Sequence, residues 1–208
     1  MKKIKDLLDH IFIDGLSGMA QGLFATLIIG TIIQQIGTLI GGPRGDMIFA
    51  VGKVAAALTG AGIGVGVAAK FKESYLVVVS AATAGMVGAF ASKLLAGTVL
   101  VDGTMVFAGP GEPLGAFLAA YIGIECGHLV AGRTKVDILV TPIVTIGTGS
   151  LVGLLVGPGV SKIMTSLGAM INWGVEQQPF LMGIVVSVLM GMILTLPISS
   201  AVLGIILN

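Results

Sequence analysis

The chain has 208 residues, of which 55% are apolar and only 10% are Asp, Glu, Lys or Arg, and its formal net charge is +1. A soluble domain needs a charged shell of about 25% of its residues, so this composition excludes a conventional water-soluble enzyme. It also excludes an intrinsically disordered chain, which requires low hydrophobicity and a high net charge. No basic excess points to nucleic acid, and a single cysteine, Cys126, allows neither an internal disulfide nor a cysteine-based zinc site. The sequence therefore predicts an integral membrane protein.

The first fourteen residues have a pattern of their own. Lysines and aspartates alternate there with apolar residues at the spacing of one helical face, which are Ile4, Leu7, Leu8, Ile11 and Phe12. The pattern is typical of an amphipathic helix lying in the membrane interface, although a simple leader into the first crossing would also produce it. We divide the chain into an interfacial helix at 1–14 and a membrane-embedded domain at 15–208.

Stretches that are nearly free of ionisable side chains mark the membrane crossings. A crossing helix needs about 20 mainly apolar residues. Six segments reach or approach this length: 16–40, 47–69, 75–93, 113–131, 138–157 and 180–206. The N-terminus and alternate connections carry most of the cations, which are Lys2, Lys3, Lys5, Lys70, Lys72, Arg133 and Lys135. Because cytoplasmic loops are enriched in Lys and Arg, we expect an all-α protein with six transmembrane helices and a cytoplasmic N-terminus.

The first two predicted crossings contain residues that are unusual for a membrane helix. Gln34 and Gln35 in the first indicate an inward polar face or an interhelical hydrogen bond. Lys53 in the second should either extend its charge to the interface or pair with Asp46. The run 60–66 holds two overlapping GxxxG pairs, which favour close packing of helices.

The connection between the third and fourth crossings is the most irregular segment. Thr98–Val101 and Thr104–Phe107 are β-prone, and the Asp-Gly between them is a strong hairpin signal. Two prolines and two glycines at 109–113 then forbid a regular helix. Non-helical backbone at a membrane must be buried in protein or line an aqueous cavity. We therefore predict a short β-hairpin and a re-entrant-type loop around 98–113.

Ionisable side chains at membrane depth are costly and often functional. Glu112 stands directly before Pro113, where the fourth crossing begins. Its carboxylate could accept hydrogen bonds from the neighbouring hydroxyls of a sugar or polyol. The alternative is that Glu112 only caps the helix that Pro113 starts.

A second polar cluster precedes the sixth crossing and contains Asn172, Trp173, Glu176, Gln177 and Gln178. An aromatic ring that stacks on a sugar, together with amide and carboxylate hydrogen bonds, would make a binding site. The alternative is an interfacial anchor, because tryptophan favours the headgroup region.

Glu125 and His128 lie three residues apart on one helical face. They could form a proton or polar relay, or simply a contact at a helix end. Their spacing matches no zinc motif. We expect no metal, no cofactor and no catalytic residue in this chain.

Several segments taken together resemble the enzyme IIC-like membrane proteins of the bacterial phosphotransferase system, and most closely the small branch that includes perfringolysin-regulator-like proteins. The resemblance runs along the whole chain and is carried by 109–116, 135–142, 171–173, 178–183 and 194–200.

The resemblance implies a sugar or polyol permease subunit of the bacterial inner membrane. Such a subunit is a homodimer that carries sugar to a phosphorylated IIB protein, and Glu112-Pro113 matches the turn that holds the sugar-binding carboxylate. Related chains extend further, so a C-terminus shortened at Asn208 is an expectation. Two other hypotheses stay open, namely a non-transporting regulator or sensor with this fold, and an ion-coupled secondary carrier that uses Glu125 and His128.

Overall fold

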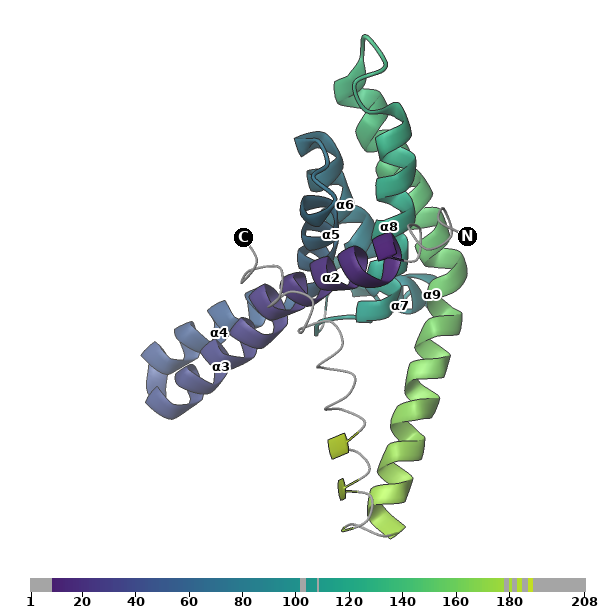
Figure 1. Cartoon of the computed structure of the whole chain (residues 1–208). Coiled ribbons are helices and arrows are strands. Elements are labelled where there is room, and N and C mark those ends of the chain that lie inside the picture. The colour runs from purple at the N-terminus through teal and green to yellow at the C-terminus, as the bar shows by residue number, and fades with distance from the viewer. Residues whose placement is uncertain are drawn as a thin grey trace, which may run out of the picture.

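The computed structural model describes residues 9–101, 104–107 and 109–177, together with positions 180, 183–184 and 187–188. The described part is mostly helical, as predicted (Figure 1). Its elements are η1 (His10–Gly15), α2 (Leu16–Leu23), η2 (Phe24–Ile28), α3 (Ile29–Ile40), α4 (Gly42–Ala57), α5 (Thr59–Lys70), α6 (Tyr75–Ala89), α7 (Ala91–Leu95), β1 (Leu100–Val101), β2 (Thr104–Met105), α8 (Pro113–Val130) and α9 (Asp137–Gln177).

The first helix runs without a break from His10 to Ile40, with two π-helical stretches, η1 and η2, inside it. It ends at Gly41, whose φ of 64° is open to glycine but strained for other residues. No break separates residue 14 from residue 15. Residues 1–8 lie outside the described part, so the interfacial helix stays a prediction.

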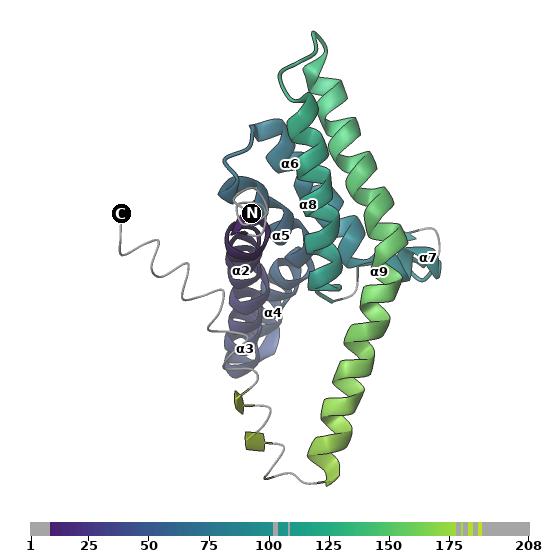
Figure 2. The same ribbon diagram turned by 45° about the vertical axis from the view of Figure 1, so that its right-hand side comes forward.

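An antiparallel pair formed by α3 and α4 projects away from the remaining helices (Figures 1 and 2). Glycines seven residues apart on each helix bring the two backbones together, so that Gly30 meets Gly52 and Gly37 meets Gly45. The outer side of the pair is apolar and exposed, as suits a surface that faces lipid. Its exposed side chains include Ile32, Ile36, Leu39, Met47, Val51 and Val54.

The predicted crossing 47–69 is not one straight helix, because α4 and α5 meet at an angle of 52°. The bend falls at Leu58, whose ψ of 11° departs from helical geometry. The buried hydroxyl of Thr59 donates to the carbonyl oxygen of Ala56 at 2.6 Å and so occupies an acceptor of the preceding turn. This side-chain bond competes with the regular backbone pattern.

The glycine run on α5 packs against two different helices. Gly60 and Gly64 touch α6, whereas Gly62 and Gly66 touch the first helix at and after α2. A methyl group on any of the four would overlap the facing helix. The prediction of close packing is confirmed, and each overlapping GxxxG pair serves a separate interface. The core around α5, α6 and α8 includes Ile63, Val67, Ala81, Phe90 and Ile124.

The predicted crossing 75–93 is also interrupted. Helix α6 ends at Ala89, and Phe90, with φ −110° and ψ 13°, separates it from the short α7. By contrast, α8 begins at Pro113 and ends at Val130, close to the predicted 113–131. Proline is well suited to the first helical position, since it has no N–H to leave unsatisfied.

The end predicted at residue 157 for the fifth crossing is wrong, because α9 continues to Gln177 and contains both Pro142 and Pro158. Between residues 158 and 177 only Lys162 and Glu176 are charged. An apolar segment of this kind satisfies its backbone groups best by staying helical in a membrane.

The predicted hairpin corresponds to a short antiparallel ladder, in which Leu100 pairs with Met105 and Val101 with Thr104. Each strand has two residues instead of the four predicted. Asp102 and Gly103 lie outside the described residues, so the Asp-Gly turn stays a prediction.

Three helical segments of the described chain are long and apolar enough to cross a membrane: His10–Ile40, Pro113–Val130 and Asp137–Ser166. A fourth is obtained if α4 and α5 form one bent crossing, and α6 is a shorter apolar helix. The predicted sixth crossing, 180–206, lies almost wholly outside the described residues. A helical membrane protein is therefore supported, and the number six stays a prediction.

Candidate functional site

Glu112 lines a pocket of about 260 Å³ where the end of α6, the short α7, the loop before α8 and the middle of α9 meet. The polar side chains on its wall are Ser92, Lys93, Glu112 and Ser161. The rest of the wall is made of small residues or proline, including Gly88, Ala89, Gly111 and Gly157. The pocket thus combines a carboxylate, an ammonium group and two hydroxyls around a space of small side chains.

The loop that carries Glu112 is fixed to the end of α6. The N–H of Glu112 donates to the carbonyl oxygen of Ala89 at 2.7 Å, and its own carbonyl accepts from the N–H of Ala116 at 3.0 Å. The first bond satisfies one of the carbonyls that a helix leaves open at its C-terminus. The second is the first hydrogen bond of α8. Glu112 is thereby held at both of its backbone polar groups.

Glu112 occupies the N-cap position of α8 in its backbone, with φ −97° and ψ 109°. Its side chain, however, makes no capping hydrogen bond. The carboxylate is half-buried on the pocket wall. Helix capping and ligand binding, the two hypotheses for Glu112, therefore apply to different parts of the residue. The backbone starts the helix, while the carboxylate remains available for a ligand.

Lys93 is a pocket residue that the sequence analysis did not single out. It lies in the last turn of α7, and its Nζ is 5.4 Å from the centroid of the Phe90 ring. Ser92 and Ser161 were missed as well. Each is an ordinary polar residue in sequence, and only the packing of α7 against α9 places it beside Glu112.

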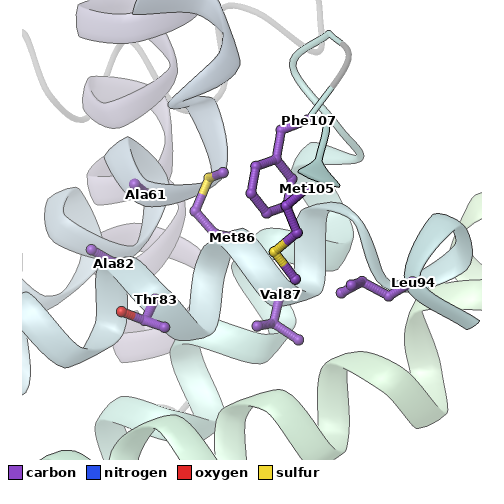
Figure 3. Close-up of a pocket in the computed structure, with 8 residues that line it drawn as sticks. All are labelled: Ala61, Ala82, Thr83, Met86, Val87, Leu94, Met105 and Phe107. Carbon is purple, nitrogen blue, oxygen red and sulfur yellow. The ribbon is translucent and has the colours of Figure 1, made fainter. Parts of the chain in front are cut away.

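A second pocket, of about 400 Å³, is almost entirely apolar. Figure 3 shows the side chains of Met86, Met105 and Phe107 converging on it. Thr83 is the one lining residue with a side-chain oxygen. A sugar buried there would lose its hydrogen bonds to water without replacement, so this pocket is unsuited to a polyol.

A third pocket, of about 520 Å³, lies on the other side of the loop and shares Pro110 with the Glu112 pocket. Gln34 and Lys53 line it. The interhelical bond predicted for Gln34 is not formed, since its Nε2 donates to Gly30 in its own helix at 3.3 Å. The pairing of Lys53 with Asp46 is also wrong, because no ion pair within 4.0 Å joins these two described residues.

Glu125 and His128 do not pair with each other. The Nε2 atom of His10 lies 3.1 Å from Oε1 of Glu125, and Nδ1 of His128 lies 2.9 Å from Oε1 of Glu73. The two contacts tie α8 to the first helix and to the α5–α6 turn, and the relay stays a prediction. The imidazole of His10 also stacks on the ring of Phe71, with centroids 3.9 Å apart.

These contacts are remote from the Glu112 pocket. Glu112 precedes the first residue of α8, whereas Glu125 and His128 lie in its last two turns. At 1.5 Å per residue, about 20 Å of helix separates Glu112 from Glu125. His10 and Glu73 could not be found from the sequence, because they are 115 and 55 residues away from their partners.

The cluster before the sixth crossing falls at the end of α9. Asn172, Trp173, Glu176 and Gln177 belong to this helix, and Gln178 lies outside the described residues. From Ser161 on the pocket wall to Asn172 the helix rises by about 16 Å. Figures 1 and 2 show this end of α9 extending beyond the other helices. The described structure therefore does not bring the two predicted polar clusters into one pocket.

Within the described part of the chain, no group of three or more His, Cys, Asp or Glu side chains is arranged to hold a metal ion. The polar pocket beside Glu112 presents groups that can hydrogen-bond a polyhydroxylated ligand.

The long apolar helices, packed through glycine, define a helical membrane protein. The family described as Phosphotransferase system, EIIC matches residues 13–208, and the chain belongs to this family. The resemblance noted in the sequence is thus confirmed at the level of the family. No curated protein and no solved structure gives a match.

Proposed function

We propose that this protein is a membrane permease component of the phosphotransferase system that binds a sugar or polyol at Glu112 and carries it to a phosphorylated IIB protein. Membership of the EIIC family supports the general role. The pocket that joins Glu112 to Lys93 and two serine hydroxyls is the observation that supports the site.

The chemistry of the pocket fits an uncharged polyol. The carboxylate of Glu112 accepts hydrogen bonds, the ammonium of Lys93 donates them, and a serine hydroxyl can do both. Vicinal hydroxyls require this mixture. Its volume of about 260 Å³ falls just below the range of about 300–1,000 Å³ typical of drug-sized ligands, which favours a single sugar ring.

The role of the chain in the reaction is to position the sugar, because the phosphoryl group belongs to the IIB partner. Holding a substrate hydroxyl in a fixed orientation makes the transfer effectively intramolecular. We propose that the protein works as a homodimer in the bacterial inner membrane, with its N-terminus in the cytoplasm.

The binding step can be tested with the detergent-purified protein and a panel of hexoses and hexitols. A ligand should raise the unfolding temperature, and Glu112→Gln should weaken its affinity by roughly 10- to 100-fold, since a hydrogen bond to a charged group contributes about 1.5–3 kcal/mol. Asp46→Asn is the matched control, because this exposed carboxylate lies outside the pocket. Full affinity in Glu112→Gln would remove Glu112 from the site.

The transport step needs a separate measurement. Proteoliposomes with phosphorylated IIB protein on the cytoplasmic face should accumulate the sugar phosphate. Binding without uptake would favour the regulator or sensor. Uptake without a phosphoryl donor would favour the ion-coupled carrier, although its proposed relay is weakened because Glu125 and His128 have different partners.

A further inference from the structure

Lys53 carries a charge in the second half of α4, whose other charged residues, Arg44 and Asp46, lie near its first turn. It lies in α4, five residues before the bend at Leu58, and its side chain is exposed from the protein. The Nζ atom of Lys53 lies 5.5 Å from the centroid of the Phe49 ring. No carboxylate of the described residues lies within 4.0 Å of it. An ammonium group at membrane depth without a counter-ion is costly. An anionic group from outside the described residues would compensate this charge.

The surroundings of Lys53 form a cavity and not a flat surface. The third pocket, of about 520 Å³, runs between α3, α4 and the loop at Gly109 and Pro110. Among the described residues that line it, Lys53 is the charged one. Gln34, on the facing helix, donates one amide hydrogen to Gly30 and keeps its second for a ligand. The pocket thus presents a net positive charge with N–H donors from two helices.

Exposed apolar side chains also lie on the helices that form the pocket. Ile28 at the end of η2, Ile32 on α3, and Val51 and Val54 on α4 are each exposed by 44–62%. A ligand that satisfies both surfaces has an anionic head at Lys53 and hydrocarbon chains along the isoleucines and valines. This combination is that of an anionic phospholipid.

We propose that Lys53 and Gln34 bind a phosphate ester, and specifically the phosphodiester headgroup of an anionic phospholipid, at a site separate from the Glu112 pocket. Lysine binds phosphate well as a point charge. The two pockets share only Pro110 among their described lining residues, and Gly109 lines the Lys53 pocket whereas Glu112 lines the other. Occupation of one therefore leaves the polar side chains of the other uncovered.

The test uses the whole chain in a neutral detergent, titrated with phosphatidylglycerol, with a diacylglycerol of the same acyl chains, or with inorganic phosphate. Bound lipid is counted by native mass spectrometry, and unfolding temperature is measured alongside. Phosphatidylglycerol should bind the wild type, and Lys53→Met should weaken that binding by about tenfold or more. Lys53→Arg should retain it, because guanidinium also binds phosphate.

Two further variants make the outcome decisive. Lys162→Met removes another exposed lysine from a membrane helix, α9, and should bind lipid like the wild type. Gln34→Leu should weaken binding without removing a charge, which tests the pocket if Lys53→Met is poorly folded. A response to inorganic phosphate alone would support the site but assign it to a soluble ester. Equal binding of diacylglycerol, or wild-type binding by both Lys53→Met and Gln34→Leu, would overturn the proposal.

Discussion

Gly111 offers the sharpest test of how the candidate site is held in place. Its φ is 73°, and a methyl group added there would lie 2.8 Å from both Cβ and the carbonyl oxygen of Ala89. Gly109, two residues earlier, has a similar φ of 82°, but a methyl group there would have nothing within 4 Å. Both Gly111→Ala and Gly109→Ala therefore carry the strain of a positive φ. Only Gly111→Ala adds a close contact with Ala89.

The magnitude of each effect follows from this comparison. An L-residue in the left-handed region costs about 1–2 kcal/mol, which is the whole expected loss for Gly109→Ala. At Gly111 the methyl group must also move away from Ala89 by about 1 Å, and overpacking of this kind costs about 1–3 kcal/mol more. For a chain of this length the additional loss corresponds to roughly 2–12 °C in Tm.

The functional effect should differ more strongly than the stability. The displaced methyl group pushes the loop from α6 and stretches the bond from the Glu112 N–H to Ala89, which is 2.7 Å long. The Glu112 carboxylate then leaves its place on the pocket wall. We expect Gly111→Ala to lose sugar-dependent stabilisation and Gly109→Ala to retain it, both measured by thermal unfolding in detergent.

The reasoning would be refuted if the two variants lost the same stability and the same ligand affinity. In that case the strain of the positive φ would account for both losses, and the contact of the loop with Ala89 would contribute nothing to stability or to ligand affinity. Retained affinity in both variants, with different stabilities, would show that the contact stabilises the fold without positioning Glu112.

Two further predictions concern the packing of the helices. Gly64→Ala should destabilise the protein by about 1–3 kcal/mol in thermal unfolding, because the new methyl group overlaps the backbone oxygen of Ala81, whereas Gly147→Ala, with nothing within 4 Å, should cause no loss. His10→Ala should cost about 1–2 kcal/mol, since it removes a ring stack and a side-chain hydrogen bond. Its effect should be less than additive with that of Glu125→Gln, and full additivity would argue against the contact.

Helix boundaries set by local chemistry could be predicted from the sequence. The first long helix ends at Ile40, before a Gly-Gly pair, and α8 starts at Pro113, as expected. Glycine and proline act on their own backbone, so their effect can be judged from a few neighbouring residues.

Boundaries set by packing could not be predicted in the same way. Three such features fall within apolar stretches: the bend at Leu58, the break at Phe90 and the continuation of α9 past residue 157. A helix that is apolar on every side has no hydrophobic face by which its direction or end could be judged.

Only part of the candidate site could be predicted from the sequence, because the rest of it is also set by packing. Glu112 was identified because it is a lone carboxylate between two helix-breaking residues at a membrane segment. Lys93 and Ser161 were not, since Lys93 lies in the last turn of the short α7 and Ser161 in the middle of α9, with nothing unusual around either in sequence. Long-range proximity of this kind arises only when α7 packs against α9.

The glycines link the packing of the bundle to the formation of the pocket. Gly88 lets α6 approach α8 at Gly115 and α9 at Gly153, while Gly157 lets α9 pass directly over Ala91. Gly88 and Gly157 also line the Glu112 pocket, whose volume is about 260 Å³. The abundance of glycine in the sequence indicates closely packed helices, and at the Glu112 pocket it is also linked to a cavity. Where helices touch through glycine backbone and the loop 109–112 crosses their ends, a hollow remains. The polar residues around that hollow determine what it can bind.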